Sequence, residues 1–168
     1  MLHTRIKICG ITRPDDARAV VDSGADAIGL VFYAGIPRAV TVEQAAEIVQ
    51  AVSPFVTVVA LFVDEPAQNV ERTLQALSVD LLQFHGDENS DYCLSFNRPG
   101  LKALRVRSGV DVTGAATRFA GARGILMDSW QEGVPGGTGK TFDWQLAQGS
   151  SSLQVVLAGG LNPGTVGA

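Results

Sequence analysis

Short apolar runs alternate along the chain with segments whose apolar residues recur every three or four positions. The runs predict seven β-strands, at residues 5–9, 26–32, 55–63, 80–84, 101–106, 124–128 and 154–158. The amphipathic segments predict helices at residues 14–23, 42–52, 66–78 and 88–96, and a less regular one at 111–120. Several strands are almost wholly apolar, which is typical of parallel strands covered by helices. The pattern therefore predicts repeated βα units.

Repeated βα units fit either an open doubly wound sheet or a closed barrel of eight strands. The spacing of roughly 20–30 residues between units and the polar side chains at many strand ends favour the (β/α)8 barrel. Such barrels usually need about 200 residues or more, whereas this chain has 168. No linker or low-complexity segment divides it. We expect one domain over residues 1–168, with seven βα units visible and the eighth missing.

Composition narrows the classes of function. Hydrophobic residues make up 46% and charged residues 18%, as in a globular chain. The net charge of −4 argues against a nucleic-acid partner. No apolar run approaches the ~20 residues that span a bilayer, and no signal peptide is visible at the N-terminus. With only two scattered cysteines, we expect a cytoplasmic protein with no disulfide and no bound metal.

The first predicted strand ends on Cys9 and breaks at Gly10. In parallel α/β proteins the carboxyl ends of the strands line the ligand crevice. Cys9 is either a small buried hydrophobe, the usual role of a free cysteine, or a thiolate that abstracts a proton. Lys7 shares the strand face of Cys9, where its ammonium either favours a thiolate or forms a structural ion pair.

The sixth predicted strand ends on Asp128 after Ile, Leu and Met. This aspartate either caps the following turn or acts as a general acid in apolar surroundings. A cysteine base combined with an aspartic acid fits proton removal at carbon together with protonation of a leaving oxygen. That combination suits an isomerase.

Two glycine-rich segments offer backbone amides to a phosphate. The first includes Gly139-Lys140-Thr141, but Val134 stands where a nucleotide-binding P-loop requires glycine, so ATP binding is not expected. Barrels commonly bind phosphate with the loops after their last strands, and a flexible surface loop is the alternative for the first segment. The glycines concerned are Gly136, Gly137 and Gly139, and after the seventh strand Gly159 and Gly160.

Two further side chains follow predicted strands. Arg38 comes after the second strand, where its guanidinium is either a clamp for a carboxylate or a solvated surface group. His85 comes after the fourth strand, as a neutral donor or acceptor for substrate or as a structural histidine.

Together these residues closely resemble the phosphoribosylanthranilate isomerase family, (β/α)8 TIM-barrel enzymes of tryptophan biosynthesis. The resemblance runs through nearly the whole chain in family order. The matching segments are residues 7–12, 24–32, 37–38, 61–63, 82–88, 136–144 and 157–163.

The resemblance implies the Amadori rearrangement of N-(5'-phosphoribosyl)anthranilate to 1-(2-carboxyphenylamino)-1-deoxyribulose 5-phosphate by general acid–base catalysis. It implies that Asp128 protonates the ribose ring oxygen and that Cys9 removes the C2′ proton. It also implies that Arg38 binds the anthranilate carboxylate and that the glycine loops bind the phosphate. No cofactor is implied, because the substrate nitrogen serves as the electron sink. The expected state is a monomer or homodimer.

Two departures from the family stand out. Ile36 replaces a small polar residue, and family members continue into an eighth strand that this sequence does not include. The alternative function is therefore an inactive truncated barrel, non-catalytic or dependent on a partner chain. Two related barrel enzymes fit less well: indole-glycerol-phosphate synthase uses a lysine and a glutamate without match here, and the isomerase of histidine biosynthesis uses two aspartates.

Overall fold

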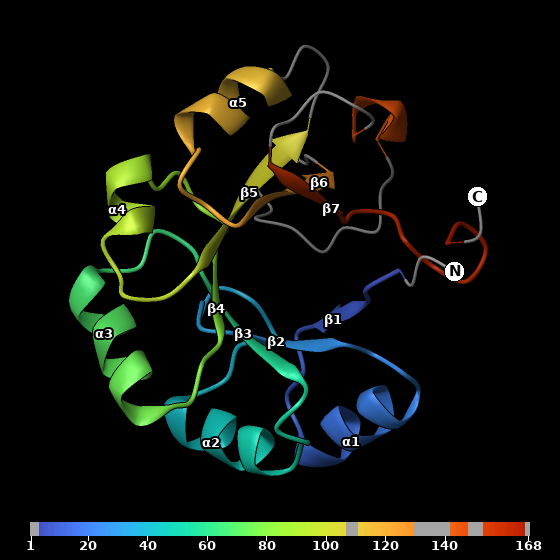
Figure 1. Ribbon diagram of the computed structural model, residues 1–168. Coiled ribbons are helices and arrows are strands. Elements are labelled where there is room, and N and C mark those ends of the chain that lie inside the picture. The colour runs from blue at the N-terminus through green and yellow to red at the C-terminus, as the bar shows by residue number, and fades with distance from the viewer. Residues whose placement is uncertain (1–3, 107–110, 130–141, 148–152, 167–168) are drawn as a thin grey trace. The chain divides into compact units, whose positions relative to one another are not determined.

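The computed structural model describes residues 4–106, 111–129, 142–147 and 153–166. The chain divides into two compact units, Met1–Gln83 and Phe84–Ala168. The strands β1 to β7 follow one another in chain order, and β4 (Leu81–Phe84) passes from the first unit into the second (Figure 1). Within the described residues, the seven predicted strands and five predicted helices are confirmed, with ends that differ by a few positions. The single domain over residues 1–168 stays a prediction.

The first unit is a parallel sheet whose strands are each followed by a helix. Its elements before β4 are β1 (Lys7–Cys9), α1 (Pro14–Asp22), β2 (Ala27–Val31), α2 (Val42–Gln50), β3 (Thr57–Phe62) and α3 (Ala67–Ala76). The three helices lie along one side of these strands (Figure 1). Fully buried apolar side chains, among them Ile28 and Phe62, form the core of this unit.

Local signals fix the loop between β2 and α2, which carries Arg38. Thr41 caps α2 in a capping box with Gln44: the Gln44 N–H donates to Thr41 Oγ1 at 3.2 Å, and the Thr41 N–H donates to Gln44 Oε1 at 2.9 Å. Just before the cap, the Val40 N–H donates to the Val31 carbonyl at 3.0 Å. The loop therefore returns to the end of β2 before the helix begins.

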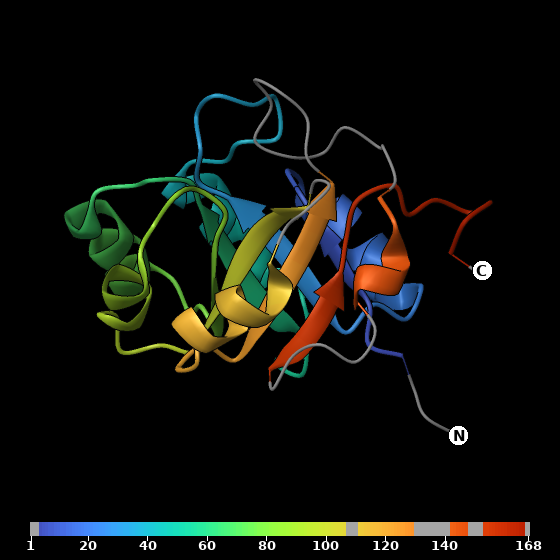
Figure 2. The ribbon, with the colours of Figure 1, turned by 90° about the horizontal axis from the view of Figure 1, so that it is seen from above.

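The second unit contains three more parallel strands. Its elements are α4 (Ser90–Leu94), β5 (Gly100–Val106), α5 (Val112–Arg118), β6 (Gly124–Ser129), the 3-10 helix η1 (Trp144–Ala147) and β7 (Gln154–Leu157). Figure 2 shows η1 beside β7. The sequence pattern did not predict η1, because a single 3-10 turn is too short to show a period.

Strand β6, which pairs with β5 and β7, is buried along its whole length, and its last two residues, Asp128 and Ser129, are buried as well. Ile125 and Met127 of this strand are among the fully buried side chains of the chain. A strand that is buried on both faces explains why this segment reads as a continuous apolar run up to its aspartate. In the described parts of the chain, no helix is long and apolar enough to cross a bilayer.

Candidate active site

Cys9 is the last residue of β1, and its thiol lies against β2. The strand register pairs Cys9 with Gly29, and a Cβ built on Gly29 would stand 2.6 Å from Cys9 Sγ. The thiol therefore occupies the space that the side chain of any other residue at position 29 would fill. Cys9 is half-buried, so the thiol keeps access to solvent and to a ligand.

Arg38 is brought to the carboxyl end of β1 beside Cys9. Its Nη1 donates a hydrogen bond to the Cys9 carbonyl at 3.2 Å. Gly10 makes this approach possible, since a Cβ there would lie 2.8 Å from Arg38 Cδ, and its φ of +85° favours glycine. A guanidinium carries five N–H donors and this bond uses one, so the group can also bind an anion next to the thiol.

Asp128 faces His85 in the second unit. His85 Nε2 lies 3.3 Å from Asp128 Oδ2, and the two side chains are 7% and 8% exposed. The other carboxylate oxygen, Oδ1, accepts a hydrogen bond from the Ser129 N–H at 2.8 Å. The hydrogen bond at Oδ1 and the imidazole close to Oδ2 restrict the direction of this buried carboxyl group, and a general acid needs a defined direction to deliver its proton to one atom.

The turn after β7 approaches the same carboxyl group. Gly159 has a φ of +76°, and a Cβ built there would lie 2.8 Å from Asp128 Oδ1 and 2.5 Å from the Ser129 nitrogen. Gly160 follows with a φ of +73°, and its carbonyl accepts a hydrogen bond from Thr165 Oγ1 at 2.9 Å. Only glycine permits the backbone to pass this close to Asp128.

The structure thus assembles the predicted residues in two groups. Cys9 and Arg38 meet in the first unit, and His85, Asp128 and Gly159 meet in the second, with Gly160 next in the chain. Three predicted phosphate-binding glycines, Gly136, Gly137 and Gly139, lie outside the described residues. No group of three or more His, Cys, Asp or Glu side chains suited to a metal ion occurs among the described residues.

The two thiols of the chain differ in environment. Cys93, in α4, is 4% exposed, and burial raises its pKa to about 11. A thiol in that state is neither a nucleophile nor a base near neutral pH. Cys9, by contrast, is half-buried at a strand end and is the more accessible of the two thiols.

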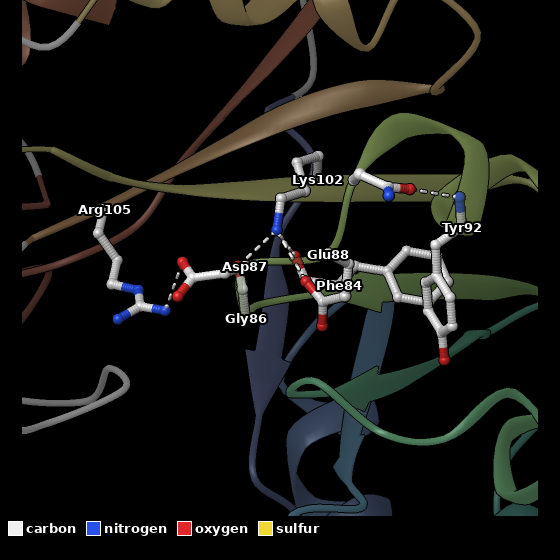
Figure 3. Close-up of polar contacts among 8 residues, drawn as sticks. Phe84, Gly86, Asp87, Glu88, Tyr92, Lys102 and Arg105 are labelled. Atoms are coloured by element: carbon white, nitrogen blue, oxygen red, sulfur yellow. Dashed lines mark hydrogen bonds and ion pairs between the residues drawn. The ribbon is translucent and has the colours of Figure 1, made fainter.

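A buried ion pair beside His85 is not among the features that the sequence pattern predicts. Lys102 Nζ lies 2.8 Å from Glu88 Oε2, and the two side chains are 5% and 3% exposed (Figure 3). The signal for it was present, because Lys102 stands inside the apolar run of the fifth strand. Its partner was not visible, since nothing in a one-dimensional pattern links positions 14 residues apart across a helix.

The chain is similar to known proteins of one enzyme family. The family model described as N-(5'phosphoribosyl)anthranilate (PRA) isomerase matches residues 6–168. An N-(5'-phosphoribosyl)anthranilate isomerase from Pseudomonas fluorescens (strain SBW25) is 56% identical over 168 residues, which are 100% of this chain and 80% of that protein. The chain belongs to this isomerase family. A relative from Alcanivorax borkumensis is also 56% identical, over 77% of its length.

Solved structures of the family share the fold. The phosphoribosylanthranilate isomerase of Thermotoga maritima matches with a TM-score of 0.86 at 35% identity, over 98% of this chain and 80% of that one. Another structure, in complex with reduced 1-(o-carboxyphenylamino)-1-deoxyribulose 5-phosphate, matches with a TM-score of 0.81 at 33% identity, over 98% and 79%. The predicted fold is confirmed: these 168 residues carry seven βα units of the TIM-barrel fold of this family, and not an open doubly wound sheet.

Proposed function

We propose that Asp128 and Cys9 are the acid and the base of the isomerisation that defines this family. Family membership makes the chain an isomerase of tryptophan biosynthesis that acts on N-(5'-phosphoribosyl)anthranilate. The roles of single residues are our proposal. The observation that carries it is the buried Asp128 carboxyl group, whose Oδ1 accepts from the Ser129 N–H and whose Oδ2 lies 3.3 Å from His85 Nε2.

The first step opens the ribose ring. Asp128 donates its proton to the ring oxygen, the bond from C1′ to that oxygen breaks, and the nitrogen lone pair forms a C1′=N iminium. Burial of the Asp128 side chain supports this role, because a site closed to bulk water keeps a transferred proton from leaking to solvent. His85 also supports it, because its Nε2 lies 3.3 Å from Asp128 Oδ2 and is placed to orient the carboxyl group.

The second step removes the C2′ proton, which the adjacent iminium has acidified. Cys9 as a thiolate takes this proton, and the electrons of the C–H bond form the C1′=C2′ enolamine while the nitrogen regains its lone pair. The enolamine then takes a proton at C1′ from water and gives its C2′ hydroxyl proton to water to form the ketone, while Cys9 loses its proton to solvent and Asp128 regains one from solvent. The sequence is redox-neutral and needs no external electron acceptor.

Arg38 and the glycine turns would hold the two anionic ends of the substrate. The ligand named for the solved relative carries both a carboxylate and a phosphate, so binding requires two anion sites. We assign the carboxylate to Arg38, whose guanidinium lies beside Cys9. We assign the phosphate to the amides of Gly159 and Gly160, together with those of Gly136, Gly137 and Gly139. An anchor remote from the reacting atoms supplies binding energy without obstructing the chemistry.

Turnover of freshly generated N-(5'-phosphoribosyl)anthranilate by the purified chain tests these roles. Cys9→Ala and Asp128→Asn should each lower kcat by orders of magnitude while the thermal unfolding transition stays close to that of the unsubstituted chain. Phe55→Ala, at a 94% exposed position, is the matched control and should keep full turnover. Undiminished turnover in either of the first two variants would remove that residue from its role.

Oligomeric state and location are further parts of the proposal. We propose a cytoplasmic enzyme that works as a monomer or homodimer, without nucleic acid. A solved structure, 32% identical to this chain with a TM-score of 0.78, is named as monomers of the dimeric isomerase from Thermotoga maritima. Light scattering at micromolar concentration measures the mass directly, and a mass above that of two chains would overturn this part.

A further inference from the structure

Lys102 holds a buried ammonium group in β5. Its Nζ donates to Glu88 Oε2 at 2.8 Å, to the Gly86 carbonyl at 2.6 Å and, more weakly, to the Phe84 carbonyl at 3.5 Å (Figure 3). An ammonium has three N–H donors, so each of them has an acceptor. The group is also 5.8 Å from the centroid of the Phe119 ring. Such full satisfaction gives the lysine one defined orientation.

Two backbone acceptors of the Lys102 ammonium lie on either side of His85 in the chain. The carbonyl groups of Phe84 and Gly86 belong to the residues immediately before and after His85. The ammonium therefore fixes the backbone on both sides of the residue whose imidazole lies 3.3 Å from Asp128 Oδ2. Glu88, two residues further along, ties the same loop to β5 through its carboxylate.

Strand geometry keeps Lys102 away from the substrate side of Asp128. In the register of β5 with β6, Lys102 pairs with Ile125, and Arg105 pairs with Asp128. Side chains alternate between the two faces of a strand, so Lys102, three residues before Arg105, lies on the opposite face from Asp128. The contacts of Lys102 lead toward Asp128 through the loop that carries His85.

Stability alone does not account for such a pair. Removing two charges from water is costly, and apolar residues of similar volume often replace a buried ion pair without loss of stability. What the pair supplies in addition is a fixed geometry at a chosen point of the backbone. That point is His85, which directs the carboxyl group proposed as the general acid.

We infer that Lys102 and Glu88 form a positioning pair for the isomerisation, which holds His85 in place and thereby the carboxyl group of Asp128. The inference rests on the proposed acid role of Asp128. It assigns Lys102 and Glu88 no contact with substrate. Their effect on the reaction passes through the imidazole of His85.

A structural test reads the contact between His85 and Asp128 without any substrate. The chain has two histidines, so His3→Gln leaves His85 as the only imidazole in a carbon–proton NMR spectrum. In this background Asp128→Asn should shift the His85 ring signals, because it replaces the carboxyl group 3.3 Å away with an amide. When Lys102→Met and Glu88→Gln are also present, the same substitution should shift them by less than half as much. An undiminished shift would overturn the inference.

The combined Lys102→Met/Glu88→Gln variant is chosen because it leaves no buried charge without a partner, which protects folding. Asp87→Asn is the matched control for Glu88→Gln. Asp87 immediately precedes Glu88 in the same loop. Its side chain is 92% exposed and lies 3.4 Å from Arg105 in an ion pair, from which Asp87→Asn removes one charge. We expect Asp87→Asn to leave the His85 signals in place, since exposed pairs contribute little. If Asp87→Asn moved the His85 ring signals as far as Glu88→Gln does, the inference would also be overturned.

A kinetic cycle tests the consequence for the reaction. The combined variant should lower kcat with little change in KM, because it disturbs the acid and leaves the anion sites intact. In a His85→Gln background the same pair of substitutions should change kcat by less than about twofold, because the imidazole through which the pair acts is already absent. Independent effects that multiply would contradict the inference. Val112→Ala, in α5, controls for a general loss of stability and should leave kcat unchanged.

The two experiments separate this inference from the proposed function. If the NMR shift depends on Lys102 and Glu88 but Asp128→Asn keeps full turnover, the positioning of His85 stands and the acid role of Asp128 fails. If Asp128→Asn abolishes turnover but the NMR shift is the same with and without Lys102 and Glu88, the acid role stands and the positioning fails.

Discussion

Cys9 Sγ occupies the place of a side chain at Gly29, since a Cβ at that position would stand 2.6 Å from the sulfur. Gly29→Ala must therefore displace the thiol from the end of β1. We expect kcat/KM to fall by about 10²-fold, because small misplacements of a reacting group carry costs of that order. Steady-state kinetics measures this. Gly100→Ala is the control, since its Cβ would meet nothing closer than 3.4 Å. Equal kinetics in the two variants would contradict the geometry.

Gly159→Ala should lower kcat by more than its loss of stability explains. Its Cβ would approach Asp128 Oδ1 and the Ser129 nitrogen, so the carboxyl group must move. Gly24→Ala shares the positive φ but meets no atom within 4 Å. We expect both variants to lose about 1–2 kcal/mol of unfolding free energy from backbone strain. Only Gly159→Ala should lose kcat, by about 10²-fold. A similar loss in Gly24→Ala would show that the effect is general destabilisation.

Arg38→Ala should weaken binding more than it slows chemistry. A charge-assisted hydrogen bond contributes about 1.5–3 kcal/mol, which corresponds to roughly a 10- to 100-fold rise in KM. Arg38→Lys should restore part of the affinity, because it keeps the charge but not the two-pronged geometry. An unchanged KM in Arg38→Ala would remove the residue from the site.

The two cysteines should react at very different rates. Burial raises the pKa of Cys93 to about 11, so at pH 8 only about one Cys93 thiol in a thousand is ionised. Iodoacetamide at pH 8 should therefore label the folded chain at Cys9 alone, and turnover should fall in step with that labelling. Peptide mass spectrometry locates the label. Labelling of Cys93 ahead of Cys9 in the folded chain would contradict this environment.

Periodicity was sufficient to locate the strands and helices, because several strands are short apolar runs and most of the helices have an apolar stripe. The predicted helix over 42–52 begins at the observed start of α2, where Thr41 and Gln44 form a capping box. Candidate residues at strand ends followed from the rule that ligands bind beyond the carboxyl ends of parallel strands.

The contacts between those residues could not be read from the sequence. The approach of Gly159 to Asp128 depends on the backbone path of a turn, and that of Gly29 to Cys9 on the register of two strands. The pair of Lys102 and Glu88 depends on how a loop folds back over β5. Each is a tertiary relationship, which no local pattern encodes. The roles of the predicted site residues stay predictions.

A kinetic isotope effect tests the division of labour between Cys9 and Asp128 most directly. Turnover of substrate deuterated at C2′ is compared with that of ordinary substrate, for the unsubstituted chain, Cys9→Ser and Asp128→Asn. A weaker base makes C2′ proton removal slower, so Cys9→Ser should enlarge the isotope effect. Loss of the acid makes ring opening slower, so Asp128→Asn should suppress it toward unity. The same change in both variants, or the reverse pattern, would contradict the assignment of Cys9 as base and Asp128 as acid.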